Sequence, residues 1–441
     1  MDTIFAPISN LGGSIVSIRF SGKNAFDVLN YFSISNEIHP KKDLFFAKLK
    51  DPQTKSIIDE VVVKIFREPN SFTGENVVEF DLHAGRLILN EILEKASNIP
   101  NFRFAKNGEF TRRAFLNGKI NLVKSEGINA IIRAESKQQQ KLANAMFYGT
   151  IYDKYQQIRK RLIEAIGFVE TQIDFSEEEV PQNIIKDLQD IKNDLISEFS
   201  TCLDDKNAID RINNGVSIAI IGEPNVGKST LLNWLARREI AIVSPIAGTT
   251  RDILHVDVDL NGYKATFYDT AGLRNCDDII EQEGMRRAKN IADGSDLCIV
   301  LFDKPEDYQL QKKEYLNKYK NILFVINKSD LFVKPDNNFD NDALFVSLLN
   351  KTNLDKLLQQ ITDAVLKQVE LQHTPLVANE RHFFLIKECI SILQNIDFNV
   401  MPIEIIGEEL RIVIDKIGQI TGQVYTDDIL DNIFSKFCIG K

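Results

Sequence analysis

The sequence has few cysteines, no excess of basic residues and no long apolar run. Its five cysteines are scattered without pairs at metal-ligand spacing, and an odd number fits a reducing compartment better than a disulfide framework. No stretch is apolar enough to span a membrane. The first residues, Met1 to Phe5, lack the basic region and apolar core of a signal peptide. We therefore expect a cytoplasmic protein that makes no membrane contact.

Acidic residues outnumber basic ones, 63 to 53, which gives a formal net charge of −10. This balance argues against a protein that coats nucleic acid, but it leaves room for local basic patches. With 44% hydrophobic and 26% charged residues, the composition is that of a globular protein. A chain of 441 residues is long for one hydrophobic core, so we expect two or three domains.

Strand and helix patterns divide the chain into four segments. Residues 1–118 mix alternating strands, such as Ser14–Phe20, with helical patterns and predict an α+β domain. Residues 119–213 and 372–441 carry apolar residues three and four apart, which predicts helices. Residues 214–371 alternate strand and helix, as a doubly wound α/β sheet requires. The sequence thus predicts a multidomain protein in which an α-helical bundle is interrupted by an inserted α/β domain.

The segment Gly222–Ser229 fits the phosphate-loop spacing G-x-x-x-x-G-K-S and follows the apolar run Val216–Ile221. Its glycines let the backbone curl so that successive N–H groups point at phosphate oxygens, and the following helix adds its positive N-terminal end. Lys228 would reach the β- and γ-phosphates, and the Ser229 hydroxyl would bind Mg²⁺. The alternative is an ordinary glycine-rich turn. It is disfavoured because an amphipathic helix and three companion motifs follow in the expected order.

Two companion motifs complete a γ-phosphate and magnesium site. Asp269–Gly272 follows a strand-like stretch, so the aspartate can hold Mg²⁺ through water and Gly272 can offer its N–H to the γ-phosphate. Gly248–Asp252 lies in a loop long enough to fold over the nucleotide, and Thr250 would complete the Mg²⁺ shell. Each motif alone could be an ordinary turn, but together with the phosphate loop they are specific.

The third companion motif, Asn327-Lys328-Ser329-Asp330, selects the base. A carboxylate accepts two hydrogen bonds from guanine N1–H and the 2-amino group, a donor pair that adenine lacks. The Asn327 amide can bond the base and neighbouring loops, and the Lys328 stem can cover the ring. A solvated turn is the alternative, and the apolar strand directly before the motif disfavours it. The sequence therefore predicts that the ligand is GTP.

One position departs from Ras-like GTPases. In them the residue after the D-x-x-G motif is often a glutamine that orients the attacking water, whereas this chain has Leu273. Another group must therefore orient the water. Glu281 and Glu283 are candidates because they begin an amphipathic stretch beside the γ-phosphate. A solvated helix start is the alternative interpretation of both residues.

Several stretches along the chain together form a family signature. They are Pro69–Glu75, Gly108–Lys119, Gly222–Ser229, Gly248–Asp252, Asp269–Arg274, Asn327–Asp330 and Phe437–Lys441. In this combination they resemble the tRNA-modification GTPases of the MnmE (TrmE) family, and the likeness spans nearly the whole chain. The resemblance implies a folate-binding N-terminal domain that forms a homodimer, a discontinuous helical domain, and an inserted G domain whose dimerisation and hydrolysis depend on K⁺.

The resemblance also implies a reaction and a partner. The partner is the FAD-dependent protein MnmG, with which a heterotetramer or larger complex is expected. The complex places an aminomethyl or carboxymethylaminomethyl group at C5 of the wobble uridine, position 34, of certain tRNAs. The carbon donor would be 5-formyl- or 5,10-methylene-tetrahydrofolate.

Residue roles follow from the resemblance by position. Glu281 matches the catalytic glutamate, and Cys438 matches the cysteine of the C-terminal motif. The family's K⁺ ligands correspond to Asn225 and the backbone of Ser244, Ile246 and Thr249. Its Mg²⁺ ligands correspond to Ser229 and Thr250. Its folate-binding residues correspond to Arg19, Glu75, Lys119 and Lys441. The predicted GTP-binding set is Asn225, Val226, Gly227, Lys228, Ser229, Thr230, Ser244, Pro245, Ile246, Ala247, Gly248, Thr249, Thr250, Asp269, Thr270, Ala271, Gly272, Asn327, Lys328, Asp330, Ser347, Leu348 and Leu349.

Two stretches depart from the family pattern, and two other functions compete with it. The loop Asn10–Ser14 lacks the arginine usual in the family's glycine-rich version, and Ser347–Leu349 replaces the usual Ser-Ala beside the guanine.

A ribosome-assembly GTPase would share the nucleotide motifs, but such proteins usually add a basic RNA-binding domain and this chain is acidic. A scaffold whose GTP cycle only switches shape, while the partner does all the chemistry, would need no one-carbon folate.

We predict that Glu281→Ala lowers kcat for GTP hydrolysis by about a hundred- to ten-thousandfold and leaves nucleotide affinity nearly unchanged. The reason is that the carboxylate orients the attacking water, directly or through a second water. Glu283→Ala is the matched control and should hydrolyse GTP at the parental rate. Steady-state hydrolysis in K⁺ and nucleotide titration measure both quantities. A parental rate for Glu281→Ala, or failure of Glu283→Ala, would contradict the assignment.

Overall fold

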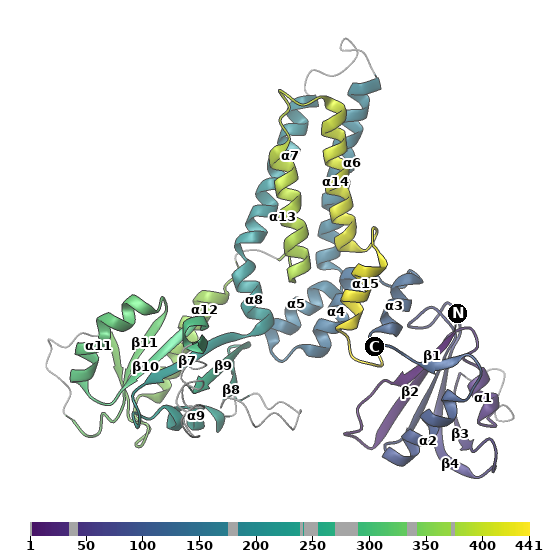
Figure 1. Cartoon of the computed structure of the whole chain (residues 1–441), viewed down its shortest axis with the longest axis horizontal. Coiled ribbons are helices and arrows are strands. Elements are labelled where there is room, and N and C mark those ends of the chain that lie inside the picture. The colour runs from purple at the N-terminus through teal and green to yellow at the C-terminus, as the bar shows by residue number, and fades with distance from the viewer. Residues whose placement is uncertain are drawn as a thin grey trace, which may run out of the picture. The chain divides into compact units, whose positions relative to one another are not determined.

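The computed structural model describes residues 2–34, 43–174, 184–238, 241, 255–269, 290–332, 342–371 and 375–441. The chain divides into two compact units. Figure 1 labels their helices and strands. One holds residues 1–129, 146–180 and 401–441, and the other holds residues 130–145 and 181–400. In this described part of the chain, no helix is both long and apolar enough to cross a membrane.

The first unit is built on a six-stranded sheet. Its strands are β1 (Thr3–Pro7), β2 (Ile15–Ser21), β3 (Leu44–Lys50), β4 (Ile57–Phe66), β5 (Val77–His83) and β6 (Phe102–Phe104), in the order β3-β4-β5-β2-β1-β6. β1 and β6 pair in parallel, and the other neighbours pair antiparallel. In β4 the buried residues Val61, Val63 and Ile65 alternate with more exposed ones, which is the pattern of a strand with one face on a core.

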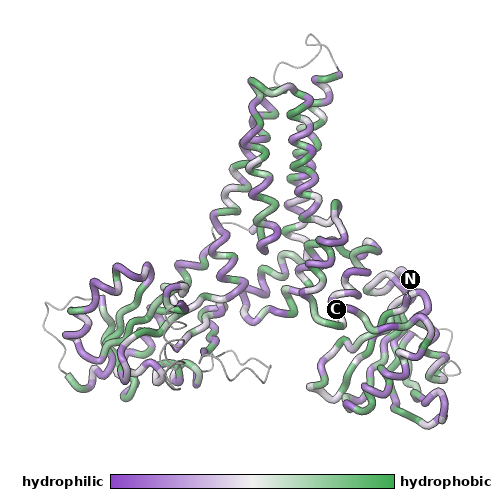
Figure 2. Tube along the Cα trace, in the orientation of Figure 1, coloured by the Kyte–Doolittle hydropathy of each residue, from purple (hydrophilic) through white to green (hydrophobic). Residues whose placement is uncertain are grey.

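Helices complete this first unit. They are α1 (Asp27–Tyr31), α2 (Arg86–Ser97), α3 (Glu109–Leu116), α6 (Thr150–Asp174), α14 (Ile403–Thr421) and α15 (Asp427–Ser435), while α4 (Leu122–Arg133) and α5 (Lys137–Phe147) carry residues of both units. Buried residues of α1 and α2, such as Val28 and Ile92, share one core with the sheet. α6 packs against α14, and Arg411 Nη2 reaches Glu170 Oε1 at 2.9 Å between them. Hydrophobic and hydrophilic residues are mixed along both helices (Figure 2). In α6 the buried residues recur three and four apart, as expected for one buried face: Ile151, Tyr155, Ile158, Leu162, Ala165 and Val169.

The second unit contains another six-stranded sheet. Its strands are β7 (Val216–Gly222), β8 (His255–Leu260), β9 (Tyr263–Asp269), β10 (Leu297–Phe302), β11 (Ile322–Ile326) and β12 (Ala343–Phe345), in the order β12-β11-β10-β7-β9-β8. β8 and β9 pair antiparallel, and the other neighbours pair in parallel. β10 is buried along its whole length, which explains its unbroken apolar sequence. The carboxyl ends of the parallel strands therefore meet at one edge.

The helices of the second unit precede, interrupt and follow its strands along the chain. They are α7 (Ile184–Asp204), α8 (Lys206–Asn214), α9 (Lys228–Ala236), α11 (Pro305–Lys318), α12 (Leu354–Val369) and α13 (Glu380–Asn395). α7 packs against α13, and α8 packs against α12. The structure confirms the predicted fold class: an α+β part, helical parts and a Ras-like α/β part. The four predicted segment boundaries are not tested by the division into two units and stay a prediction.

Candidate functional site

The phosphate loop connects β7 to α9 at the carboxyl edge of the second sheet. Gly227 has φ +109°, and a Cβ there would lie 2.5 Å from Asn327 Nδ2. A side chain would thus be strained and would displace the amide that packs on the loop. Asn225 also has a positive φ, 65°, and Val226 is buried beneath the loop. The loop backbone is therefore fixed by its own dihedral angles and by one neighbouring side chain.

Lys228 and Ser229 begin α9, directly after this loop. Lys228 Nζ donates hydrogen bonds to the carbonyl oxygens of Gly222 and Glu223, at 2.7 and 2.6 Å. Ser229 Oγ donates to Asp269 Oδ2 at 2.6 Å, and Asp269 at the end of β9 is buried. Among the described residues, no group of three or more His, Cys, Asp or Glu could hold a metal ion by itself. One hydroxyl and one carboxylate nevertheless suit Mg²⁺, which keeps waters and binds phosphates.

The Asn327 side chain joins three loops. Asn327 is buried at the end of β11, where its Nδ2 donates to the Val226 carbonyl at 2.8 Å and its Oδ1 accepts from the Leu348 N–H at 3.0 Å. The Leu348 contact is made by its backbone, so the leucine that replaces the family's alanine keeps this bond. Its side chain is buried, and Leu349 is 83% exposed.

Asp330 and Lys328 belong to the motif that is predicted to select the base. Ser347 Oγ donates to Asp330 Oδ1, which orients that carboxylate. Lys328 Nζ bonds Asp303 Oδ2 at 2.8 Å, so the lysine stem is held across the loop after β10. The structure thus brings the phosphate loop, the base-selecting motif and Ser347 together, whereas Thr230 faces solvent one position after Ser229.

Much of the predicted γ-phosphate machinery falls outside the described residues. This applies to Ser244, Pro245, Ile246, Ala247, Gly248, Thr249, Thr250, Thr270, Ala271 and Gly272, and also to Leu273, Glu281 and Glu283. Their predicted roles in Mg²⁺ and K⁺ binding and in hydrolysis stay predictions.

A second group of predicted residues lies in the first unit. Arg19 on β2 bonds Glu79 Oε1 on β5 at 2.8 Å, and its guanidinium stacks 5.2 Å from the Phe72 ring and 5.5 Å from the Phe110 ring. Lys119 Nζ donates to the Pro69 carbonyl at 2.8 Å. Arg19 and Lys119 therefore both contact the loop Pro69–Glu75.

A buried arginine holds Glu75, the remaining predicted residue of this loop. Arg113 Nη1 lies 3.1 Å from Glu75 Oε1, and Arg113 Nη2 lies 2.8 Å from Asp2 Oδ1 and 3.2 Å from Glu109 Oε1. Ser21 Oγ also donates to Glu75 at 2.8 Å. Burial raises the pKa of the Glu109 carboxyl, but hydrogen bonds and charge from Arg103, with the charge of Arg113, bring it below its ordinary value. The Glu109 carboxyl is thus kept ionised.

The residues after α15 return to the first sheet. Gly440 has φ +93°, and a Cβ there would lie 2.1 Å from the carbonyl oxygen of Pro7, the last residue of β1. The Cys438 carbonyl accepts hydrogen bonds from Gly108 N–H at 3.3 Å and from Lys441 N–H at 3.4 Å. Cys438 is exposed. This segment therefore contacts the end of β1, and β1 pairs with β2, the strand that carries Arg19.

Sequence reasoning missed several partners of the predicted residues. Glu79, Asp303 and Arg113 were not assigned roles, yet they hold Arg19, Lys328 and Glu75. Strand alternation offers a signal for Glu79, because it faces Arg19 across the β2–β5 pair. Arg113 lies within the signature Gly108–Lys119, but nothing in the sequence marks it as the arginine that is buried.

Comparisons with known proteins match the whole chain. A family model described as GTP-binding protein TrmE N-terminus matches residues 3–119, and one described as MnmE helical domain matches residues 122–438. The tRNA modification GTPase MnmE of Rickettsia bellii (strain OSU 85-389) is 38% identical over 450 residues, covering 100% of both chains. That of Wolbachia sp. subsp. Brugia malayi (strain TRS) is 38% identical over 448 residues, covering 100% of this chain and 99% of its own. A crystal structure of an Aquifex aeolicus Era variant bound to GDP·AlF4⁻ is 28% identical, with a TM-score of 0.27, and covers 36% of this chain and 58% of its own.

Asp330→Asn should shift the nucleotide preference from GTP toward XTP. An amide keeps one acceptor for Ser347 but presents a donor to the guanine edge, so GTP affinity should fall by roughly ten- to a hundredfold. The 2-oxo group of xanthine accepts the new donor. Competition binding with GTP, XTP and ATP measures the change, and ATP should stay weak throughout. A variant that still prefers GTP over XTP would refute the role of Asp330.

Gly440→Ala should release the segment after α15 from β1. The left-handed φ and the overlap with the Pro7 carbonyl would cost about 2 kcal/mol or more together. Amide hydrogen exchange of residues 436–441 should therefore speed up by about tenfold or more. Gly167→Ala, at an exposed position of α6, is the control, since a Cβ there meets nothing within 4 Å among the described residues. Equal exchange in both variants would show that Gly440 does not anchor the segment.

Proposed function

The chain belongs to the MnmE family of tRNA modification GTPases, and on that premise we propose its full reaction and its partners. It hydrolyses GTP in a K⁺-dependent cycle and acts as a homodimer with the FAD-dependent protein MnmG, in a heterotetramer or larger complex. Together they add an aminomethyl or carboxymethylaminomethyl group at C5 of the wobble uridine, position 34, of certain tRNAs. The one-carbon unit comes from 5-formyl- or 5,10-methylene-tetrahydrofolate. We place this work in the cytoplasm.

GTP binding uses the edge of the second sheet. The backbone N–H groups of the phosphate loop and the Lys228 ammonium bind phosphate oxygens, and Asp330 accepts from the guanine edge. Asn327 keeps the phosphate loop and Leu348 in place while this happens, because both halves of its amide are already bonded to them. The chain thus supplies position and charge, which is most of what phosphoryl transfer requires.

The cation sites are proposed from the donors on the loop. Ser229 and Asp269 would hold Mg²⁺, together with Thr250. The exposed side chain of Asn225 supplies an amide oxygen for K⁺, together with backbone oxygens of Ser244, Ile246 and Thr249. A monovalent cation there would stabilise charge on the β–γ bridging oxygen, where other GTPases use an arginine.

The one-carbon chemistry is supported chiefly by the position of Cys438. Its exposed thiol belongs to a segment anchored by Gly440 on β1 and by Gly108 before α3, in the same unit as Arg19, Glu75 and Lys119. A folate offers a flat ring with N–H donors and a carboxylate tail. Glu75 can accept from the ring, and Lys119 and Lys441 can pair with the carboxylates.

The deciding experiment replaces Cys438 by serine in cells that carry no other copy. Nucleoside mass spectrometry should show unmodified wobble uridine, while the purified variant hydrolyses GTP at the parental rate and unfolds at the parental temperature. Cys389→Ser, at a buried cysteine on α13, controls for the loss of a thiol. Normal modification with Cys438→Ser would remove this thiol from the site. Failure of the purified parent to bind a one-carbon folate would favour a scaffold role instead.

Exchange of Na⁺ for K⁺ at fixed ionic strength should raise the GTP hydrolysis rate steeply. Asn225→Ala should lose most of that difference and keep its affinity for GDP, because only the cation ligand is removed. Phosphate release measures the GTP hydrolysis rates of the parent and of Asn225→Ala in the two salts. Equal rates in Na⁺ and K⁺ for the parent would rule out the K⁺ site.

A further inference from the structure

The loop Pro69–Glu75 is held to its surroundings through its backbone. Ser71 Oγ donates to the Glu75 carbonyl oxygen at 2.6 Å, and Asn117 Nδ2 donates to the Thr73 carbonyl oxygen at 2.7 Å. These bonds fix the path of the loop without using the Glu75 carboxylate. Other groups therefore set the orientation of that carboxylate.

A chain of two buried hydroxyls ends on the carboxylate. Ser21 Oγ, at the end of β2, donates to Glu75 Oε2 at 2.8 Å and lies 2.7 Å from Thr73 Oγ1. A hydroxyl has one proton, so with the Ser21 proton on Glu75 the Thr73 hydroxyl donates to Ser21 Oγ. Thr73 Oγ1 in turn accepts from the Glu75 N–H at 3.3 Å. The three residues thus form a closed ring of hydrogen bonds that supplies one donor to Oε2.

Arg113 on α3 is the second donor to the Glu75 carboxylate. Its Nη1 lies 3.1 Å from Glu75 Oε1 and 3.2 Å from Oε2, and it also donates to the Asp2 carbonyl oxygen at 3.0 Å. Its Nη2 donates to Asp2 Oδ1 at 2.8 Å and to Glu109 Oε1 at 3.2 Å. Because the arginine is buried, water cannot readily replace these bonds. Each terminal nitrogen thus bonds Asp2 and one further carboxylate.

The two carboxylate oxygens of Glu75 are not equivalent. Oε2 accepts from Ser21 and Arg113, whereas among the residues that the structure describes Oε1 has Arg113 alone. A carboxylate oxygen can accept two hydrogen bonds, so Oε1 keeps one position for a further donor. The Glu75 side chain is 12% exposed, which leaves the carboxylate within reach of a ligand.

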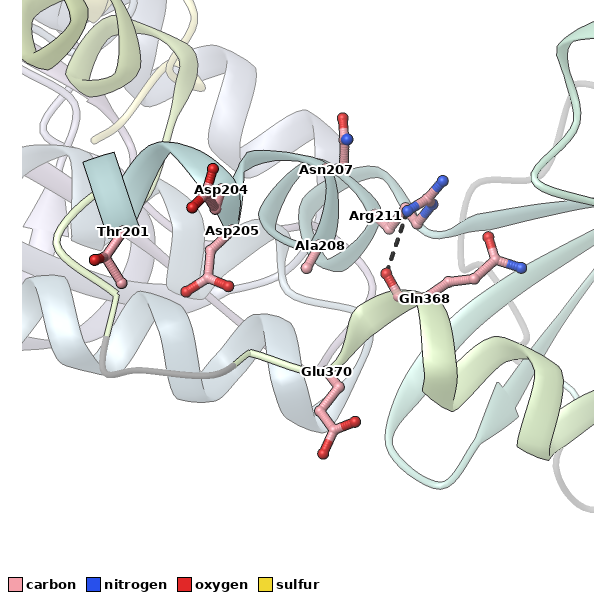
Figure 3. A pocket seen from close by; sticks show the side chains of 8 residues that line it. All are labelled: Thr201, Asp204, Asp205, Asn207, Ala208, Arg211, Gln368 and Glu370. Atoms are coloured by element: carbon pink, nitrogen blue, oxygen red, sulfur yellow. Dashed lines mark hydrogen bonds between the residues drawn. The ribbon is translucent and has the colours of Figure 1, made fainter. Parts of the chain in front are cut away.

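Convergence of donors distinguishes Glu75 from the acids of a cavity in the second unit. That cavity, of about 280 Å³, is lined in part by Arg211 and Gln368, and Arg211 Nη1 donates to the Gln368 carbonyl oxygen at 3.2 Å (Figure 3). The Asp204 and Asp205 side chains in its lining point to opposite sides of the chain (Figure 3). Acids that point apart do not present a single oriented acceptor, whereas Glu75 does.

We propose that Arg113 and Ser21 are positioning residues of the one-carbon folate site, an assignment that rests on the folate binding proposed above. They hold the Glu75 carboxylate so that the unfilled position of Oε1 accepts from an N–H group of the folate ring. Both act through Glu75 and not by contact with the folate. An acceptor that is already oriented loses less conformational freedom when the ligand binds, which raises the affinity.

Calorimetric titration of the full-length protein with 5-formyl-tetrahydrofolate tests the proposal. Arg113→Lys should weaken binding by roughly tenfold or more, because an ammonium keeps the charge but cannot bond three carboxylates at once. Arg103→Lys is the matched control. Arg103 bonds Asp2 and Glu109, the two other carboxylates of this cluster, so its variant should bind the folate as the parent does. Equal weakening in both variants, or parental binding by Arg113→Lys, would overturn the proposal.

A double-mutant cycle separates positioning from a general effect on the fold. Glu75→Gln keeps one acceptor oxygen, so its weaker binding stays measurable at higher ligand concentration. In that background Arg113→Lys should weaken binding by less than about twofold, because no carboxylate remains for it to orient. A general loosening of the fold would instead weaken binding equally in both backgrounds, and that result would contradict the positioning role.

Ser21→Ala removes a single hydroxyl and decides the question if Arg113→Lys does not fold. It should weaken folate binding by roughly three- to tenfold, because Oε2 loses one of its two donors. Failure of the parent to bind 5-formyl-tetrahydrofolate would refute the proposed folate function and this assignment with it. Binding by the parent that Arg113→Lys and Ser21→Ala leave unchanged would refute the assignment alone.

Discussion

The two hydrogen bonds of the Asn327 side chain are the contact on which the nucleotide site depends. They tie the end of β11 to the phosphate loop on one side and to the loop after β12 on the other. The amide is buried, so each bond that is lost would leave a polar group without water or protein to satisfy it. Gly227 leaves the space that this amide fills. One side chain thus ties the phosphate loop to the loop after β12.

In the first unit, ion pairs to one buried arginine join separate segments of the chain. Arg113 is buried and reaches three carboxylates, from the chain start, the loop before β5 and its own helix. An arginine suits this role because its fork of donors can bond several acceptors at once.

Two cysteines lie in different environments. Burial raises the pKa of the Cys298 thiol to about 11, which suppresses its thiolate, whereas Cys438 is exposed.

The nucleotide half of the molecule could be predicted from sequence because its determinants are local. Backbone geometry at Gly227 and the order of Lys228 and Ser229 are set by neighbours along the chain, and an apolar run such as Leu297–Phe302 identifies a buried strand without reference to its partners. The environment of Glu75 could not be predicted in this way. Its partner Arg113 lies 38 residues away, and only packing decides which of the adjacent arginines Arg112 and Arg113 turns inward.

The pairing of helices in each unit has a consequence for how the chain acquires its structure. In the first unit α6 meets α14, with Glu170 and Arg411 separated by 241 positions, and in the second α7 meets α13. Everything between α7 and α13, including the nucleotide-binding sheet, can form before α14 leaves the ribosome, whereas the apolar face of α6 must wait for it. Long-range closure of this kind is slow and exposes hydrophobic surface meanwhile. On a nascent chain the apolar face of α6 therefore stays uncovered until α14 has been synthesised.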